Sequence, residues 1–234
     1  MIGCLVIIAV AIPLIVWYVI SKCKKYDLKE LFLKTSISLL FVVLAVVATL
    51  VSGKFTLLNG LVILGLVFGL VGDILLDLKY VDIERTKGYS YGGFIVFGIG
   101  HILFITALIA TYYQKGGIWF IVLPILVAIA LAFVTILMEK PLKLKYGEYK
   151  LISFLYAICL FGTCAFSLFL AIQNNFSIVS LNLFLIGALL FAASDLVLSG
   201  TFFGEGKERP IDFALNYATY YGAQFLIAFL LLLA

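Results

Sequence analysis

Apolar and polar positions are arranged along this chain in long blocks, with eight apolar runs separated by short polar segments. A helix of roughly 20 apolar residues crosses a bilayer core of about 30 Å, so each run is long enough to span a membrane. The predicted transmembrane helices are 2–20, 31–51, 57–76, 91–112, 117–138, 151–172, 178–198 and 213–234. The pattern therefore predicts an all-α polytopic membrane protein, a bundle of eight transmembrane helices.

The segments between the apolar runs are too short to hold a second domain. The longest of them, 77–90 and 199–212, contain 14 residues each. We therefore expect a single transmembrane domain over residues 1–234. The first run lacks the basic start of a secretory signal, and its nearest lysines follow it, which predicts that this span is retained.

Composition supports a membrane protein and excludes other classes. Apolar residues make up 65% of the chain and charged residues 12%, against about 45–50% and about 25% in a soluble domain. Too little polar surface remains to coat a soluble enzyme, and the chain is too apolar to be disordered. The net charge is +4, but the basic residues lie in short loops, so nucleic acid is not an expected partner.

The distribution of basic residues predicts how the bundle is oriented. The odd-numbered loops hold 13 of the 16 Lys and Arg residues, whereas the even-numbered loops hold only Lys54 and Lys115. By the positive-inside rule, the odd-numbered loops face the cytoplasm and both termini face outward. We expect the host membrane to be the cell membrane.

Ionisable side chains within the apolar runs are few, and all lie toward the expected cytoplasmic end. Each costs at least about 2.5–3.5 kcal/mol to insert, so those that remain are candidates for function. They are Lys34, Asp73, His101 and Asp195, with Asp77 and Asp212 at helix ends. Asp73 follows Gly65 and Gly69 at four-residue spacing, and such a small-residue face points toward another helix.

The last apolar run adds a line of polar side chains. Asp212, Asn216, Tyr220 and Gln224 recur every four residues and therefore share one helix face. Together with the intramembrane acids, this line predicts a polar pocket with apolar walls in the cytoplasmic half of the bundle.

The same residues also have structural interpretations. A buried aspartate can simply bond a neighbouring helix, and His101 can bridge two helices. Lys34 lies near the end of its run, and we expect its long side chain to extend to the cytoplasmic interface. The tyrosines at 217, 220 and 221 are also consistent with an interfacial aromatic belt.

Several chemistries are excluded by what the sequence lacks. The chain has one histidine, so a zinc site of three histidines is impossible. It contains no G-x-S-x-G elbow and no phosphate-binding G-x-x-x-x-G-K-[ST] loop. No metal or cofactor is implied, and carboxylate chemistry in a lipid-accessible pocket remains.

Four short blocks, which follow one another from the third run to the eighth, carry a wider similarity. They are residues 72–76 in the third run; Phe94, Phe97, Gly100, His101 and Phe104 in the fourth; Leu190, Phe191, Ser194, Asp195 and Leu196 in the seventh; and Tyr220, Tyr221, Gln224 and Leu226 in the eighth. In this order they resemble the lysoplasmalogenase family of integral membrane proteins, also called the YhhN family. That family usually has a tyrosine three residues after the histidine, where this chain has Phe104.

The resemblance implies a reaction and a set of site residues. Characterised members of that family hydrolyse the vinyl ether bond of lysoplasmalogens to a fatty aldehyde and glycerophosphocholine or glycerophosphoethanolamine. Asp73 and Asp195 are the implied catalytic pair, the substrate is a membrane lysophospholipid, and no cofactor is involved. The side chains expected around the pair are His101, Tyr220, Gln224, Asn216, Asp77, Ser194 and Lys34, with Lys34 or Lys79 meeting the phosphate.

Carboxylate chemistry fits this reaction. Vinyl ether cleavage needs a proton for the alkene, stabilisation of an oxocarbenium-like cation and addition of water, much as glycoside hydrolysis does with two carboxyl groups. Two carboxyl groups in one enclosed site can hold different protonation states, one acting as the acid while the other is ionised. The sequence leaves open which aspartate is the acid.

The main alternative is a small proton-coupled transporter or a lipid-binding membrane protein. In that case the two aspartates would carry protons or recognise a cationic substrate. A purely structural membrane protein would leave the polar layer unexplained. The oligomeric state is also left open by the sequence.

Overall fold

Eight long helices make up the protein in the computed structural model, which describes residues 1–22, 28–114, 117–204 and 209–234. They are α1 (Ile2–Lys22), α2 (Leu28–Ser52), α3 (Leu57–Leu78), α4 (Thr86–Tyr112), α5 (Trp119–Leu137), α6 (Lys150–Gln173), α7 (Val179–Phe203) and α8 (Pro210–Phe229). Short 3₁₀ turns lie at Ile83–Arg85, Gly147–Tyr149 and Leu230–Leu232. All eight are long and apolar enough to cross a membrane. The predicted all-α, eight-helix membrane protein is confirmed.

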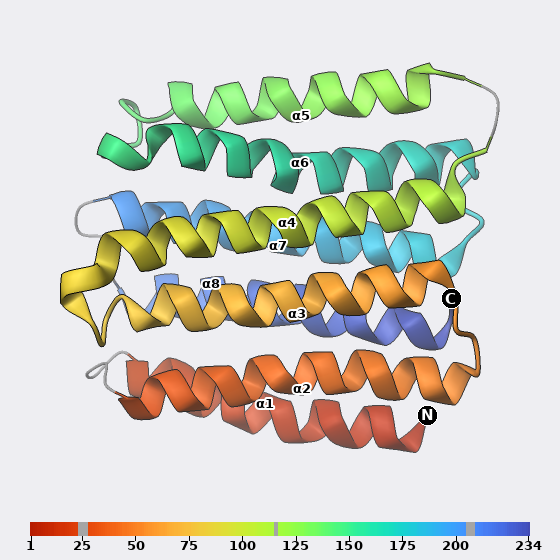
Figure 1. Ribbon diagram of the computed structural model, residues 1–234, viewed down its shortest axis with the longest axis horizontal. Helices are drawn as coiled ribbons and strands as arrows, with labels where there is room; N and C mark the ends of the chain where they lie inside the picture. The colour runs from red at the N-terminus through yellow and green to blue at the C-terminus, as the bar shows by residue number, and fades with distance from the viewer. Residues whose placement is uncertain (23–27, 115–116, 205–208) are drawn as a thin grey trace.

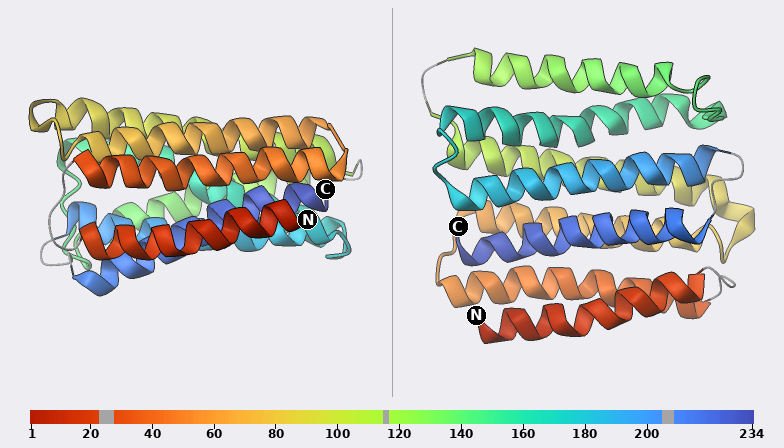
Figure 2. Two further views of the ribbon diagram at one scale, coloured as in Figure 1. Left: turned by 90° about the horizontal axis from the view of Figure 1, so that it is seen from below. Right: turned by 180° about the vertical axis from the view of Figure 1, so that it is seen from behind.

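The helices run up and down, and the two termini lie at the same end of the bundle (Figure 1). Seven of them close a ring in the order α1, α2, α3, α4, α6, α7, α8, in which each helix packs against the next and α8 packs back on α1. Two layers are visible in Figure 2, with α2, α3 and α4 in one and α1, α8 and α7 in the other. Helix α5 packs against α6 outside this ring.

Several helices extend beyond the ends that hydropathy predicts, mostly at the end with the odd-numbered loops. Helix α1 ends at Lys22 rather than residue 20, α2 begins at Leu28 rather than 31, α4 begins at Thr86 rather than 91, and α7 ends at Phe203 rather than 198. Hydropathy marks where apolar residues stop, whereas a helix continues as long as its backbone hydrogen bonds do. The polar ends of the helices therefore build a deeper site than the sequence suggests.

Helices α3 and α4 approach closely along a row of glycines. A Cβ atom at Gly65 would lie 2.4 Å from Phe104 Cε1, and one at Gly72 would lie 2.6 Å from Phe97 Cε2. The absent side chains are what allow the two phenyl rings of α4 to rest on the α3 backbone. This packing holds Asp73, the next residue after Gly72, inside the ring.

The basic residues are distributed in the structure as the sequence predicts. Among the described residues outside the helices, Lys54 lies in the α2–α3 connection at the end bearing the termini, whereas Lys79, Lys140, Lys143 and Lys145 lie at the opposite end. Lys24, Lys25, Lys115 and Lys207, which also entered the orientation argument, lie outside the described residues.

Candidate functional site

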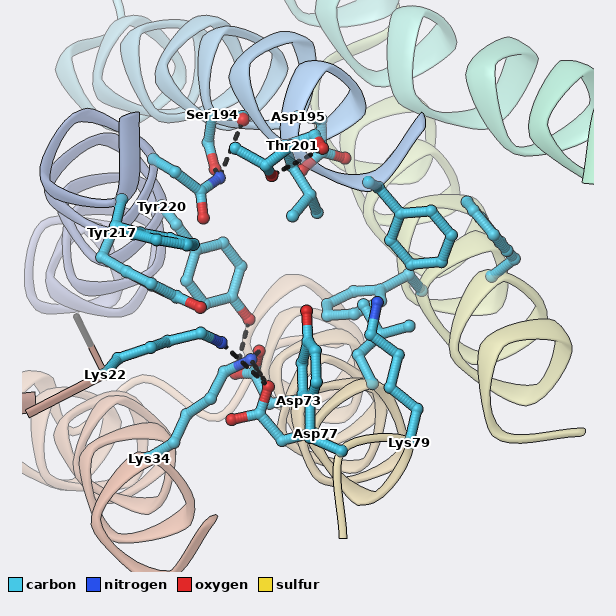
Figure 3. Close-up of a pocket in the computed structure, with 18 of the residues that line it drawn as sticks. Lys22, Lys34, Asp73, Asp77, Lys79, Ser194, Asp195, Thr201, Tyr217 and Tyr220 are labelled. Carbon is cyan, nitrogen blue, oxygen red and sulfur yellow. Dashed lines mark hydrogen bonds and ion pairs between the residues drawn. The ribbon is translucent and has the colours of Figure 1, made fainter. Parts of the chain in front are cut away.

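A small polar cavity, which we call the charged chamber, lies at the end of the bundle with the odd-numbered loops. Its volume is about 70 Å³. Its polar lining residues are Lys22, Lys34, Asp73, Asp77, Lys79, Tyr80, Tyr156, Ser194, Asp195, Thr201, Asn216, Tyr217 and Tyr220. Both predicted catalytic aspartates therefore line one cavity, with Asp73 on the α3 wall and Asp195 on the α7 wall (Figure 3).

A cation and two hydroxyl groups contact the carboxyl group of Asp73. The Lys34 Nζ atom lies 3.2 Å from Asp73 Oδ1. The hydroxyl of Ser38 donates to Asp73 Oδ2 at 2.6 Å, and the hydroxyl of Tyr220 donates to the same oxygen at 2.7 Å. Only 3% of Asp73 is exposed. A buried carboxylate is stable as an ion only with such partners, and this one has three.

The second acid of α3, Asp77, shares the same cation. Lys34 Nζ lies 2.9 Å from Asp77 Oδ1, and the Tyr18 hydroxyl donates to Asp77 Oδ2 at 2.9 Å. Lys22 Nζ adds a longer ion pair at 3.7 Å. The carboxyl group of Asp77 therefore forms ion pairs with two lysines, one from α1 and one from α2.

The structure corrects the expected position of Lys34. Its side chain does not extend to the interface, because it is 5% exposed and lies between two carboxylates. Helix α2 begins at Leu28, so Lys34 lies six residues inside it. Its buried charge is compensated by the two nearby aspartates, so the side chain does not have to reach water.

Asp195 has very different surroundings. It lies eight residues before Phe203, the last residue of α7, which is about 12 Å along the helix. Its carboxylate accepts a hydrogen bond from the Tyr156 hydroxyl. Among the described residues no lysine, arginine or histidine forms an ion pair with Asp195, so its charge has no cationic partner.

His101 does not line the chamber and instead lies behind it. It is 2% exposed, and its Nδ1 atom lies 3.0 Å from the Thr163 hydroxyl. Its Nε2 atom lies 3.5 Å from the Tyr156 hydroxyl. The ring of Phe191 packs against the imidazole with centroids 4.7 Å apart. His101 therefore reaches Asp195 only through Tyr156.

Gln224 and Asn216 of α8 hold other predicted residues in place through hydrogen bonds. Gln224 Nε2 donates to the Tyr220 hydroxyl at 3.0 Å, so it supports the donor to Asp73. Asn216 Nδ2 donates to the carbonyl and the hydroxyl of Ser194, each at 2.9 Å. Tyr217, Tyr220 and Tyr221 are buried, so they are not part of an interfacial belt.

Sequence reasoning missed Tyr156, Ser38 and Tyr18. Each lies within an apolar run, where a single hydroxyl does not change the hydropathy. One signal was available for Tyr156, because Cys159 and Thr163 follow it after three and seven residues, which puts three polar groups on one face of α6. No comparable pattern marks Ser38 or Tyr18.

A larger apolar cavity adjoins the charged chamber. Its volume is about 300 Å³, and α5, α6, α7 and the α5–α6 connection form most of its wall. Leu144 of that connection forms an isolated bridge to Gly204, and Lys145 N donates to the Phe203 carbonyl at 2.8 Å. The residues that line both cavities are Leu76, Phe94, Tyr156, Asp195, Leu198 and Phe202. Asp195 and Tyr156 therefore stand where polar and apolar spaces meet.

Two of the lysines that line the chamber lie close to aromatic rings in its wall. Lys79 Nζ lies 3.5 Å from the centroid of Phe202, and Lys22 Nζ lies 4.9 Å from that of Tyr80. Burial raises the pKa of Tyr80 above its usual value, so its hydroxyl stays neutral. Within the described ranges, His, Cys, Asp and Glu form no group of three or more that could hold a metal ion.

The fold and the site together define a class of protein: a polytopic α-helical integral membrane protein with a charged chamber that shares part of its wall with an apolar cavity. The model of the YhhN family matches residues 30–231 of this chain, which therefore belongs to that family. No curated protein and no solved structure matches the chain.

Proposed function

We propose that this protein is a membrane hydrolase that cleaves the vinyl ether bond of lysoplasmalogens. The products are a fatty aldehyde and glycerophosphocholine or glycerophosphoethanolamine. Membership of the YhhN family agrees with this activity. The observation that carries the proposal is the position of Asp195, which lines both the charged chamber and the apolar cavity. A vinyl ether also stands at such a boundary, because it links a polar glycerol headgroup to an apolar chain.

The reaction requires one proton and one water molecule. An acid protonates the alkene carbon remote from the ether oxygen, which leaves an oxocarbenium ion at the other carbon. Water adds to that carbon and loses a proton to a base, giving a hemiacetal. The hemiacetal hydroxyl then gives up its proton as the bond to the glycerol oxygen breaks. That oxygen takes up a proton and leaves as the alcohol, while the former alkenyl chain becomes the aldehyde. Two carboxyl groups suffice for these steps, as they do in glycosidases.

The surroundings of the two aspartates support different roles for them in this proposal. Asp195 has no cationic partner among the described residues and adjoins an apolar cavity, so it is the group suited to hold and deliver the proton. Asp73 is ionised and already accepts three polar contacts. An ionised carboxylate offers about four lone-pair sites, which leaves roughly one for a water molecule. Asp73 therefore orients water and stabilises the cation.

The substrate would lie across both cavities. Its alkenyl chain occupies the apolar cavity between α5, α6 and α7, and its phosphate lies in the charged chamber near Lys22 and Lys79. Lys34 is unsuited to bind the phosphate, because Asp73 and Asp77 already hold its ammonium group. Such a substrate, a lysophospholipid, reaches the site from the surrounding membrane lipid.

The proposed orientation follows from the lysines. The chamber lies at the end of the bundle where most basic residues gather, so by the positive-inside rule it faces the cytoplasm and both termini face outward. We propose the cell membrane as the host membrane.

The test is turnover by the purified protein. Wild type in detergent is supplied with a lysoplasmalogen, and the released aldehyde is followed by a coupled dehydrogenase. Asp73→Asn and Asp195→Asn are each expected to lower kcat by at least about a hundredfold, the range for losing an acid or base. Asp82→Asn is the matched control, because Asp82 lies in the α3–α4 connection and does not line the chamber.

Folding of each variant is checked by gel filtration and by its melting temperature. A wild type that releases no aldehyde from any lysoplasmalogen would refute the proposal. Full activity in either folded aspartate variant would refute the assigned pair.

A further inference from the structure

Four side chains form a line of polar contacts that runs from the inside of the helix ring to the chamber. Thr163 and Tyr156 of α6 flank His101 of α4, and Tyr156 continues the line to Asp195 of α7. The Tyr156 hydroxyl donates to Asp195 Oδ2, and it lies 3.5 Å from His101 Nε2, at the long end of hydrogen-bond distance.

The hydroxyl of Thr163 fixes which nitrogen of His101 carries the proton. That hydroxyl has a single proton, and the carbonyl of Cys159 lies 3.1 Å away in the usual position for a bond back along the helix. With its proton on this carbonyl, the Thr163 oxygen accepts from the Nδ1–H of His101 at 3.0 Å. The Nε2 atom is then an acceptor and faces the Tyr156 hydroxyl.

Tyr156 therefore has two possible acceptors for its one proton. When Asp195 is ionised, Tyr156 donates to the carboxylate, which is the contact in the structure. When Asp195 is protonated, the acid donates to the Tyr156 oxygen, and Tyr156 turns its own proton to His101 Nε2. Without that nitrogen, the second arrangement would leave a hydroxyl proton unpaired, which is unfavourable at a buried site.

We infer that His101 and Tyr156 are positioning residues that stabilise the protonated form of Asp195, so that it can act as the acid. This inference rests on the proposed function and deepens it. The titratable and charged groups around Asp195 are Tyr156 and Cys164 of α6, Asp73 of α3 and, lining the same chamber, Lys22, Lys34, Asp77, Lys79, Tyr80, Tyr217 and Tyr220. None of the cations among them pairs with Asp195, and His101 is buried between aromatic rings without a carboxylate.

The experiment is an infrared titration that needs no substrate. A protonated carboxyl group has a carbonyl stretch that disappears on ionisation, and subtracting the spectrum of Asp195→Asn from that of wild type assigns the Asp195 band. The band is followed against pH in wild type, His101→Leu and His101→Gln. Leucine removes the acceptor, whereas the glutamine amide oxygen can restore it opposite Tyr156.

The midpoint of the Asp195 band is expected to fall by about one pH unit in His101→Leu, which corresponds to roughly one hydrogen bond. In His101→Gln it should stay near the wild-type value. An unchanged midpoint in His101→Leu, or equal shifts in both variants, would overturn the inference, as would the absence of any Asp195 band in wild type. If His101→Leu does not fold, Thr163→Val decides in its place, since the released Nδ1 lets the proton move to Nε2, and a downward shift is again expected.

The titration also separates this inference from the proposed function. If wild type releases no aldehyde, the hydrolase proposal fails, while the band still reports whether His101 and Tyr156 stabilise the proton. If wild type is active, the alkaline limb of its kcat–pH profile should move with the band in the same variants.

Discussion

Replacing Lys34 with methionine tests the electrostatic core of the charged chamber. Methionine keeps the length of the side chain and removes only its charge. The Lys34 Nζ atom lies 2.9 Å from Asp77 Oδ1 and 3.2 Å from Asp73 Oδ1. Both carboxylates are almost completely buried, at 2% and 3% exposure. In the variant, the cation that the described residues still place beside these carboxylates is Lys22, at 3.7 Å from Asp77.

The expected loss of stability follows from this geometry. Removing one member of a buried ion pair destabilises a protein by about 3–5 kcal/mol, because it leaves an uncompensated buried charge. That is a large part of the roughly 5–15 kcal/mol that stabilises a typical domain. The loss should be smaller at pH 5 than at pH 8, since the stranded carboxylates can then take up a proton.

Thermal and denaturant unfolding in detergent, followed by circular dichroism, measures the effect. Lys54→Met is the matched control, because Lys54 is exposed in the α2–α3 connection, and it should change the stability by less than about 0.5 kcal/mol. The double variant Lys34→Met/Asp77→Asn should recover much of the loss, because it removes one of the two stranded charges. If Lys34→Met behaves like Lys54→Met, then Lys34 reaches water and the ion-pair network described above is wrong.

Two further predictions concern helix packing and the apolar cavity. Gly100→Ala should destabilise the protein by about 1–3 kcal/mol, because the new Cβ would lie 3.1 Å from the Gly65 carbonyl oxygen. Gly98→Ala on the same helix, where a Cβ would meet no atom within 4 Å, should instead stabilise the protein by about 0.5–1 kcal/mol. Equal melting temperatures of the two variants would contradict this prediction. Ala157→Phe, which fills the apolar cavity, should lower kcat/KM for long-chain lysoplasmalogen about tenfold, or roughly 1.4 kcal/mol, whereas Leu189→Phe on the exposed face of α7 should not.

The number of helices could be predicted from the sequence because the membrane imposes it. Each crossing needs a long apolar run, so hydropathy finds all eight helices. Which helices pack against one another could not be predicted, because helices of similar apolar composition look alike in a hydropathy pattern. Nothing in residues 119–137 distinguishes α5, which packs outside the ring on α6, from the helices within it.

The site was predictable only where a charge interrupts an apolar run. Asp73 and Asp195 are visible for that reason, since each acid in a span is costly and needs a partner. The partners were less visible. A tyrosine such as Tyr156 is common in a membrane helix, and the position of Lys34 depends on two carboxylates from another helix that the sequence alone does not place beside it.

The order of helices in the ring explains why the carboxyl groups of Asp73 and Asp195 have different partners. Helix α2 packs against α3 and α8, so its lysine reaches Asp73 and Asp77. Helix α7 packs against α6 and α8, and α6 in turn packs against α4, so the line of contacts from Asp195 runs through hydroxyl groups and an imidazole. The ring thus places one aspartate beside a lysine and the other beside a tyrosine. This asymmetry suits the proposed acid and its partner better than it suits a pair of interchangeable proton carriers.

Access to the chamber also favours a hydrolase over a transporter. Between the chamber and the end of the bundle that bears the termini, the described core is filled by large apolar side chains that are almost completely buried: Phe41, Leu66, Phe104, Leu108 and Phe184. A transported proton or ion would have to cross this layer, at several kcal/mol for each unpaired charge. A lysolipid that enters from the side through the apolar cavity and leaves as two products at the same end would not.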